Sequence, residues 1–82
     1  MRVTVLYFAV VRDLVGCEKE LLELPTDVKT TGDLAAWLPA VRPELAGRMG
    51  SVRIARNEAF ATADEALAEG DVLALIPPVA GG

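Results

Sequence analysis

The sequence contains no histidine and a single cysteine, Cys17. Without histidine, the Ser-His and Cys-His pairs that activate nucleophiles are excluded, and the commonest metal ligand is missing. One cysteine cannot form an internal disulfide, which is typical of a protein from the reducing cytoplasm. No cluster of cysteines or carboxylates has the spacing of a metal site. We therefore expect no metal and no bound cofactor.

Long apolar runs and a basic surface are also lacking. No run approaches the roughly 20 apolar residues of a membrane span, and residues 1–5 begin a strand pattern without the apolar core of a signal peptide. The chain has 8 Lys and Arg against 12 Asp and Glu, a net charge of −4. We expect a cytoplasmic protein that binds neither membranes nor nucleic acid, because phosphate contacts dominate nucleic-acid affinity.

For its size, the chain is rich in apolar residues. Its 82 residues suffice for one domain, and 52% of them are hydrophobic, with a mean hydropathy of +0.37. A small domain buries a smaller fraction of its surface than a large one does. Part of the apolar surface should therefore stay exposed as a patch for a partner, although short Ala and Val residues also raise the average.

Four segments have the pattern of strands. Residues 2–8 and 72–76 are apolar on both faces, which predicts central strands that are buried on both sides. Residues 18–24 carry Glu and Lys, which indicates one solvated face, and Pro25 ends this strand because proline cannot donate to the ladder. Residues 51–57 alternate and predict the remaining strand.

The clearest helix signal begins at Thr30, which forms the Thr-x-x-Asp pattern of a capping box with Asp33. Apolar residues then recur at helical spacing, at Leu34, Trp37, Leu38 and Val41. Pro39 interrupts this pattern, so we expect the regular helix to end near Leu38. Shorter helical segments are predicted at residues 9–15, 43–46 and 64–67.

This order of elements predicts an α+β fold in which a mixed sheet wraps around one main helix, the β-grasp arrangement. A ferredoxin-like fold needs a second full-length helix, and residues 64–67 are too few to form one. We place the β-grasp domain at residues 1–76 and an extended C-terminal tail at residues 77–82.

The tail combines a stiff start with a slender end. Its residues are Pro77, Pro78, Val79, Ala80, Gly81 and Gly82. The prolines stop the strand ladder and hold the chain extended, while the glycines lack Cβ and can pass through a channel too narrow for a side chain. Fully extended, the six residues reach roughly 20 Å into a partner. Fraying is the alternative interpretation, but an idle chain end has no need of two prolines.

The terminal carboxylate of Gly82 can carry chemistry that the side chains cannot. A carboxylate is inert towards nucleophiles until it is activated. Adenylation by ATP makes an acyl-adenylate, which a sulfur donor can convert to a thiocarboxylate. The sulfur is then anionic and nucleophilic, so a partner enzyme can direct it at an electrophilic carbon.

The chain resembles the small subunits of molybdopterin synthases over nearly its whole length. The similarity is densest in residues 5–9, 12–16, 31–34 and 67–72, and at Asn57. It finishes in an ending that looks like the family's Pro-Pro-Val-x-Gly-Gly. Ala80 stands where the family often has serine, and alanine, being small too, keeps the tail slim.

The resemblance implies a ubiquitin-like sulfur carrier. An adenylyltransferase of the ubiquitin-activating type would use ATP to activate Gly82, and a sulfurtransferase system would supply the sulfur. The thiocarboxylated tail would enter the active site of the large synthase subunit, which would supply the catalytic side chains. There the tail would donate its sulfur to a cyclic pyranopterin precursor to build the molybdopterin dithiolene. Such subunits form heterotetramers around a dimer of large subunits.

A patch that faces this partner is expected at Leu6, Phe8 and Phe60. Leu6 and Phe8 lie on one face of the first strand. Phe60 lies in a loop-like stretch, residues 57–62, where its side chain either folds under the loop or faces the partner. Cys17 is followed by Glu18 and Glu20, whose charge disfavours a thiolate, so we interpret this residue as a small hydrophobe.

Three other functions are open from the sequence. A sulfur carrier for thiamine or for tRNA thiolation shares the Gly-Gly chemistry, although residues 9–15 and the Pro-Pro-Val tether favour the molybdopterin version. A ubiquitin-like protein modifier would transfer the activated Gly82 to an amine instead of accepting sulfur. A plain β-grasp binding module would leave the tail idle.

Overall fold

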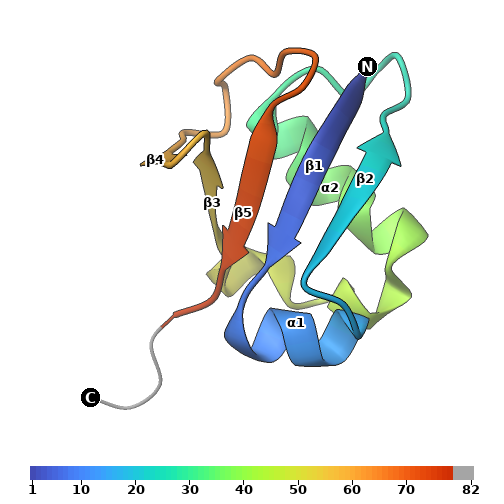
Figure 1. Cartoon of the computed structure of the whole chain (residues 1–82), viewed down its shortest axis with the longest axis vertical. Coiled ribbons are helices and arrows are strands. Elements are labelled where there is room, and N and C mark those ends of the chain that lie inside the picture. Colours follow the sequence, from blue (N-terminus) through green and yellow to red (C-terminus); the bar gives the residue numbers. More distant parts are fainter. Residues whose placement is uncertain (79–82) are drawn as a thin grey trace.

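The computed structural model describes residues 1–78, which form one mixed sheet with a helix across one face (Figure 1). The strands are β1 (Arg2–Tyr7), β2 (Lys19–Glu23), β3 (Arg53–Arg56), β4 (Ala59–Phe60) and β5 (Val72–Ile76). The helical segments are α1 (Ala9–Val15), α2 (Thr31–Val41) and two 3-10 turns, η1 (Pro43–Leu45) and η2 (Met49–Ser51). This arrangement confirms the predicted β-grasp fold.

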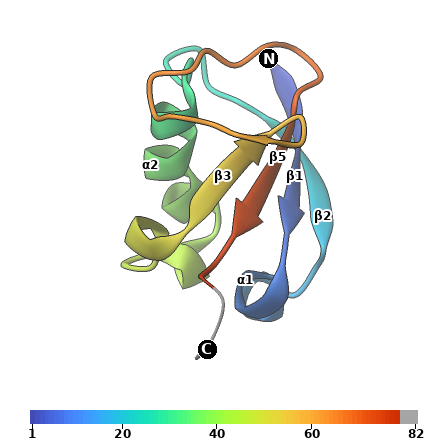
Figure 2. The same cartoon turned by 90° about the vertical axis from the view of Figure 1, so that its left-hand side faces the viewer.

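The first and last strands lie side by side in the middle of the sheet. The strand order is β2-β1-β5-β3-β4, with β1 and β5 parallel and the other pairs antiparallel. Thr4 pairs with Val72, and Tyr7 pairs with Leu75. Because two parallel strands need a crossover between them, the chain leaves the sheet after β2 and carries α2 across one face (Figure 2).

This face of the sheet and α2 enclose the hydrophobic core. Alternation along the central strands directs every second side chain towards the helix. The largest fully buried side chains are Tyr7, Leu34, Leu38, Leu45, Leu73, Leu75, Val3 and Val5. On the opposite face, Leu6, Ala74 and Ile76 are half-buried and Val72 is exposed. The prediction that both central strands are buried on both sides is wrong, because in the described chain α2 covers one face.

The start of α2 is the predicted capping box. The Thr30 hydroxyl accepts from the Asp33 backbone N–H at 3.1 Å, and the Asp33 carboxylate accepts from the Thr30 N–H at 3.1 Å. The predicted end near Leu38 is wrong, because the helix runs to Val41 with Pro39 inside it. Pro39 lies in the last turn, where it removes one backbone donor, and the Arg42 N–H still donates to the Leu38 carbonyl at 2.8 Å.

Two differences lie between β3 and β5. Residues 64–67 do not form the predicted helical segment; Ala66 instead makes an isolated antiparallel bridge to Thr30. Phe60 does not lie in a loop but in β4, which pairs with β3. The hairpin turn uses positive φ at Asn57 (51°) and Glu58 (73°). The hairpin was not predicted from the sequence because its turn contains no glycine, the usual signal for such backbone angles.

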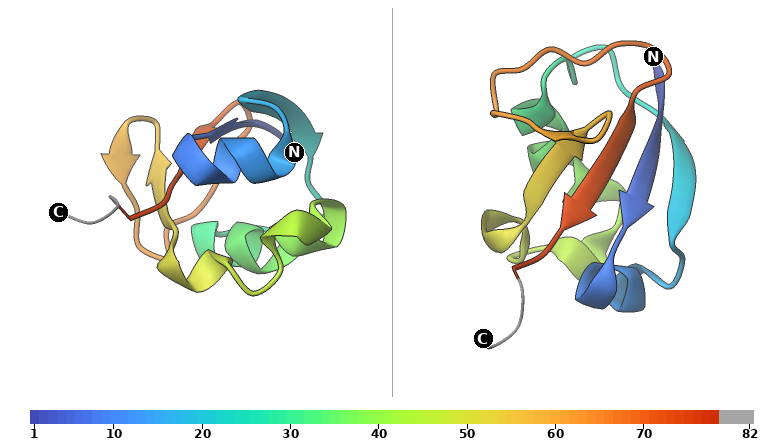
Figure 3. Two further views of the ribbon diagram at one scale, coloured as in Figure 1. Left: turned by 90° about the horizontal axis from the view of Figure 1, so that it is seen from below. Right: turned by 60° about the vertical axis from the view of Figure 1, so that its left-hand side comes forward.

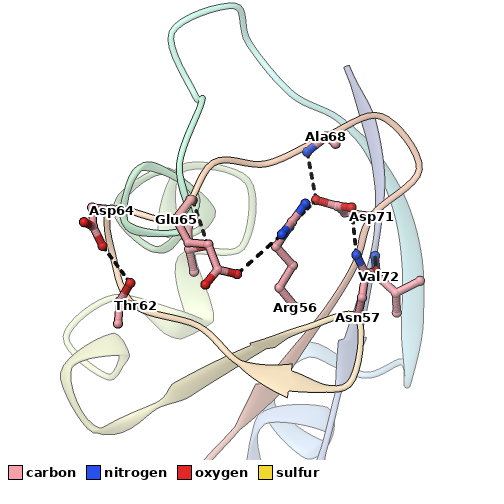
Figure 4. Close-up of polar contacts among 9 residues, drawn as sticks. Arg56, Asn57, Thr62, Asp64, Glu65, Ala68, Asp71 and Val72 are labelled. Atoms are coloured by element: carbon pink, nitrogen blue, oxygen red, sulfur yellow. Dashed lines mark hydrogen bonds and ion pairs between the residues drawn. The ribbon is translucent and has the colours of Figure 1, made fainter.

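The start of β5 is held by a buried carboxylate, Asp71 (Figure 4). Its oxygens accept hydrogen bonds from Arg56 Nε at 2.7 Å, from Asn57 Nδ2 at 2.9 Å and from the Ala68 backbone N–H at 2.8 Å. The Asn57 side-chain oxygen in turn accepts from the Val72 N–H at 2.9 Å. The network joins the end of β3, the turn before β5 and the first residue of β5, so Asp71 fixes the start of the last strand.

Two opposing effects act on the pKa of Asp71. Burial raises the pKa, because it disfavours the charged form, but the hydrogen bonds from Arg56, Asn57 and Ala68 favour that form more strongly. The pKa therefore lies below the ordinary value of an aspartate, and the carboxylate is ionised at neutral pH.

Replacing Leu34 by alanine should destabilise the domain by about 2 to 5 kcal/mol, because the side chain is fully buried between α2 and the sheet. Urea unfolding followed by the fluorescence of Trp37 would measure the change. Leu21→Ala is the control: Leu21 is 62% exposed, so its free energy of unfolding should change by less than about 0.5 kcal/mol. Equal effects of the two substitutions would contradict the assigned core.

Asp71→Asn should lower the free energy of unfolding at pH 7 by about 1 to 3 kcal/mol, because three donors lose their charged acceptor. The folded pKa lies below the unfolded one, so the carboxylate's contribution is present above about pH 4 and is lost as the pH falls through the folded pKa. Urea unfolding at several pH values should show the two proteins converging in acid. Asp13→Asn, at a side chain that is 75% exposed, should show no such pattern.

Candidate functional site

The tail begins at one end of the molecule, where β5 finishes. β5 ends at Ile76, and the described chain continues through half-buried Pro77 and exposed Pro78. In the views of Figure 1 and Figure 3, α1 lies at this same end. The other predicted tail residues, Val79, Ala80, Gly81 and Gly82, lie outside the described residues, and their roles stay predictions.

The strand that carries the tail is held on both sides. Leu75 pairs with Tyr7 of β1 and with Ile54 of β3, and Ile76 pairs with Arg53. A central strand cannot move without breaking two ladders of hydrogen bonds. The first tail residue therefore starts from a defined position and direction relative to the sheet.

Of the predicted patch, Leu6 and Phe60 lie in one row on the uncovered face of the sheet. The strand registers place Lys19, Leu6, Ala74, Ala55 and Phe60 side by side across all five strands. We call this surface, with Arg53 and Ile76 in the adjacent row, the open face. Phe8, the third predicted residue, follows β1 as the N-cap of α1. It is 45% exposed and lines a shallow hollow together with Leu6 and Lys19.

Phe60 is 54% exposed. Its side chain therefore lies on the surface and does not fold under the neighbouring segment. The Arg53 guanidinium lies over its ring, 3.8 Å from the ring centre. Such a cation–π contact holds the ring in place while leaving its edge accessible. Arg53 was not among the predicted site residues, because the contact depends on the β3–β4 hairpin. The open face thus combines apolar side chains with the cations of Lys19 and Arg53.

A second polar cluster fixes the end of β1 next to Phe8. The buried Tyr7 hydroxyl donates to the Glu20 carboxylate at 2.5 Å, and Arg42, just after α2, donates to the same carboxylate. Burial and then the hydrogen bond to Glu20 raise the pKa of Tyr7, whereas the Arg42 guanidinium lowers the pKa of Glu20. Tyr7 therefore stays a neutral donor, and the cluster ties β1, β2 and α2 together without supplying a base.

The described side chains provide little else that could react. Cys17 is half-buried and packs against the hydrophobic core, as interpreted from the sequence. Within residues 1–78, no group of three or more Cys, Asp or Glu side chains is placed to hold a metal ion. In the same part of the chain, no helix is long and apolar enough to cross a bilayer.

Comparison with known proteins agrees with this geometry. The profile of the ThiS family matches residues 5–82 of the chain. The molybdopterin synthase sulfur carrier subunit of Chlamydomonas reinhardtii is 38% identical over 84 residues, an alignment that covers 100% of both chains.

Solved structures with the same fold include two informative neighbours. SAMP1 from Haloferax volcanii, a small archaeal modifier protein, has a TM-score of 0.86 and 30% identity, with 100% of both chains covered. A chain in the complex of subunits 1 and 2 of the molybdopterin-converting factor from Helicobacter pylori has a TM-score of 0.70 and 26% identity, again with 100% of both covered. This chain therefore belongs to the ThiS family, and its full-length similarity places it with the sulfur carrier subunits of molybdopterin synthase.

Proposed function

We propose that this chain is the sulfur carrier subunit of a molybdopterin synthase and that the Gly82 carboxylate is its reacting group. The observation that carries the proposal is the full-length similarity to a carrier of that name, in a chain whose final residues follow a strand held on both sides. Its role in the enzyme is to donate sulfur, and the catalytic side chains belong to the partner.

The chemistry begins with activation by a separate adenylyltransferase of the ubiquitin-activating type. The Gly82 carboxylate attacks the α-phosphorus of ATP, which forms an acyl-adenylate and releases pyrophosphate. Sulfur delivered at the sulfide level, as HS⁻, then attacks the acyl carbon, AMP leaves, and loss of the proton gives a thiocarboxylate. ATP is therefore a substrate of the activating enzyme and not a cofactor bound by this chain.

The second stage takes place in the large synthase subunit. The thiocarboxylate sulfur attacks an electrophilic carbon of a cyclic pyranopterin precursor, and hydrolysis of the acyl bond returns the Gly82 carboxylate. The geometry of this chain suits the task, because β5 fixes where the tail starts and the prolines keep its first residues extended. A neighbouring structure contains the corresponding two subunits in complex.

The open face is the surface that we assign to the large subunit. It is a half-exposed apolar surface in a domain whose other face is filled by α2. Leu6 and Phe60 supply the apolar contact, Phe8 extends it towards the tail end of the molecule, and Arg53 supplies a cation. Exposed apolar surface of this kind marks contact sites in small soluble domains.

Protein modification is the second candidate function. It is favoured by the similarity to SAMP1, the small archaeal modifier protein of Haloferax volcanii. Both functions start from the same acyl-adenylate and differ in the nucleophile that follows, sulfur in one case and a lysine amine in the other.

When the chain is incubated with its activating enzyme, ATP and a sulfur donor, its intact mass should rise by the difference between one sulfur and one oxygen atom. The mass gain should be absent from a variant that lacks Gly82, because its terminal carboxylate then belongs to Gly81 and falls one residue short of the activating centre. Intact-mass spectrometry would measure both. An unmodified wild-type chain under these conditions would contradict the carrier function. Isopeptide-linked conjugates on other proteins would establish the modifier function.

Phe60→Ala should weaken binding to the large subunit about 30-fold, the effect of losing an aromatic side chain that anchors an interface. Isothermal titration calorimetry with the purified large subunit would give the Kd. Val41→Ala removes an apolar side chain that is 39% exposed at the end of α2, away from the open face, and should leave the Kd unchanged. An unchanged Kd for Phe60→Ala would exclude the open face as the contact surface.

A further inference from the structure

A second concave surface lies beside the start of the tail, separate from the open face. This hollow has a volume of about 320 Å³ and lies between α1, the η1–η2 segment and the two prolines. Its apolar walls are Val10, Val11, Leu14, Leu45, Val52, Pro77 and Pro78. We call it the tail-base hollow. The views in Figure 3 show α1 and the end of β5 at the same end of the molecule.

The chemistry of the tail-base hollow is apolar with one cation. Leu45 is fully buried at its base, while Val10 is 52% exposed at its edge. Arg48 and Ser51 are its polar lining residues. Arg48 is exposed, and its guanidinium forms no ion pair within residues 1–78. A volume near the lower limit of small-molecule pockets, about 300 Å³, suits one large apolar side chain.

The position of the hollow determines what can cover it. Four residues follow Pro78, and fully extended they span at most about 14 Å. If Gly82 reacts in a pocket of an enzyme, the entrance of that pocket must therefore lie close to Pro78. Because Pro77 and Pro78 form one wall of the hollow, the same approach places the enzyme over the hollow.

We propose that the tail-base hollow is a second docking point for the large synthase subunit, which inserts one apolar side chain beside Pro77 and places a carboxylate against Arg48. This inference rests on the proposed function and adds a contact that is independent of the open face. Burial of an apolar side chain supplies affinity, and the ion pair with Arg48 supplies orientation and a faster encounter. Together they align the tail with the channel that receives it.

The test is the affinity of the purified large subunit for two variants of the full chain. Arg48→Glu should raise the Kd about tenfold and reduce its dependence on salt, because a charge pair across the interface is lost. Lys29→Glu is the matched control: it makes the same charge change just before α2, outside the hollow, and should bind like the wild type.

The apolar part of the hollow is tested by Val10→Asn. Because Val10 is half-exposed, the thermal unfolding midpoint should stay close to that of the wild type while the Kd rises about tenfold. Val41→Asn, at an exposed valine outside the hollow, should change neither. Unchanged affinity in both Arg48→Glu and Val10→Asn would overturn the proposal.

Two further results separate this proposal from the function on which it rests. If the wild-type chain does not bind the large subunit at all, the proposed function fails and the docking proposal, which rests on it, is overturned with it. If the wild type binds but the two variants affect only the rate of adenylation by the activating enzyme, the large subunit is the wrong occupant and the proposal is overturned.

Discussion

The parallel pairing of β1 with β5 is the constraint on which the rest of this structure depends. It joins the first strand of the chain to the last one at the centre of the sheet, with Thr4 opposite Val72 and Tyr7 opposite Leu75. The chain between them must cross over, and it brings α2 against the face that carries Val3, Val5, Leu73 and Leu75. The same pairing holds the strand from which the tail departs. β5 thus contributes to the hydrophobic core and also carries the tail.

Because the domain is small, only one face of its sheet is covered and the other stays open. One helix, α2, is enough to bury one face, and the described chain supplies no second helical layer for the other. The uncovered face therefore keeps Leu6, Phe60 and Ile76 near solvent. In an isolated domain this exposure is a liability, and under the proposed function it supplies the contact surface for the large subunit.

The polar clusters show how precision is obtained in so small a protein. Asp71 joins β3 to the start of β5, and Glu20 joins Tyr7 to Arg42 at the opposite edge of the sheet. Each carboxylate is satisfied by several donors, and in the described residues no buried side-chain nitrogen or oxygen is left without a partner. The two clusters hold the strands that place the tail and the open face.

Much of the fold could be predicted from local patterns in the sequence. Alternation predicted the long strands, the Thr30–Asp33 capping box predicted the start of α2, and the lack of histidine together with the Gly81-Gly82 ending directed attention to the terminal carboxylate. The errors were also local in origin. Pro39 does not end α2 at Leu38, and residues 64–67 form a bridge instead of a helical segment. At Pro39 the helix tolerates the loss of one backbone donor in its last turn, whereas at Ala66 the bridge to distant Thr30 outweighs the intrinsic preference of a short segment.

By itself, the sequence determined the periodicity of the elements and the fold class, and it predicted the chemistry of the chain end, since these depend on residues close together in the chain. The tertiary structure alone decided which face of the sheet stays open, that Arg53 covers Phe60, and that α1, η2 and Pro77 enclose a hollow beside the tail. These features depend on strand register and on contacts between residues far apart in sequence. No local pattern encodes such contacts, because a shift of one residue in register would turn every side chain to the other face.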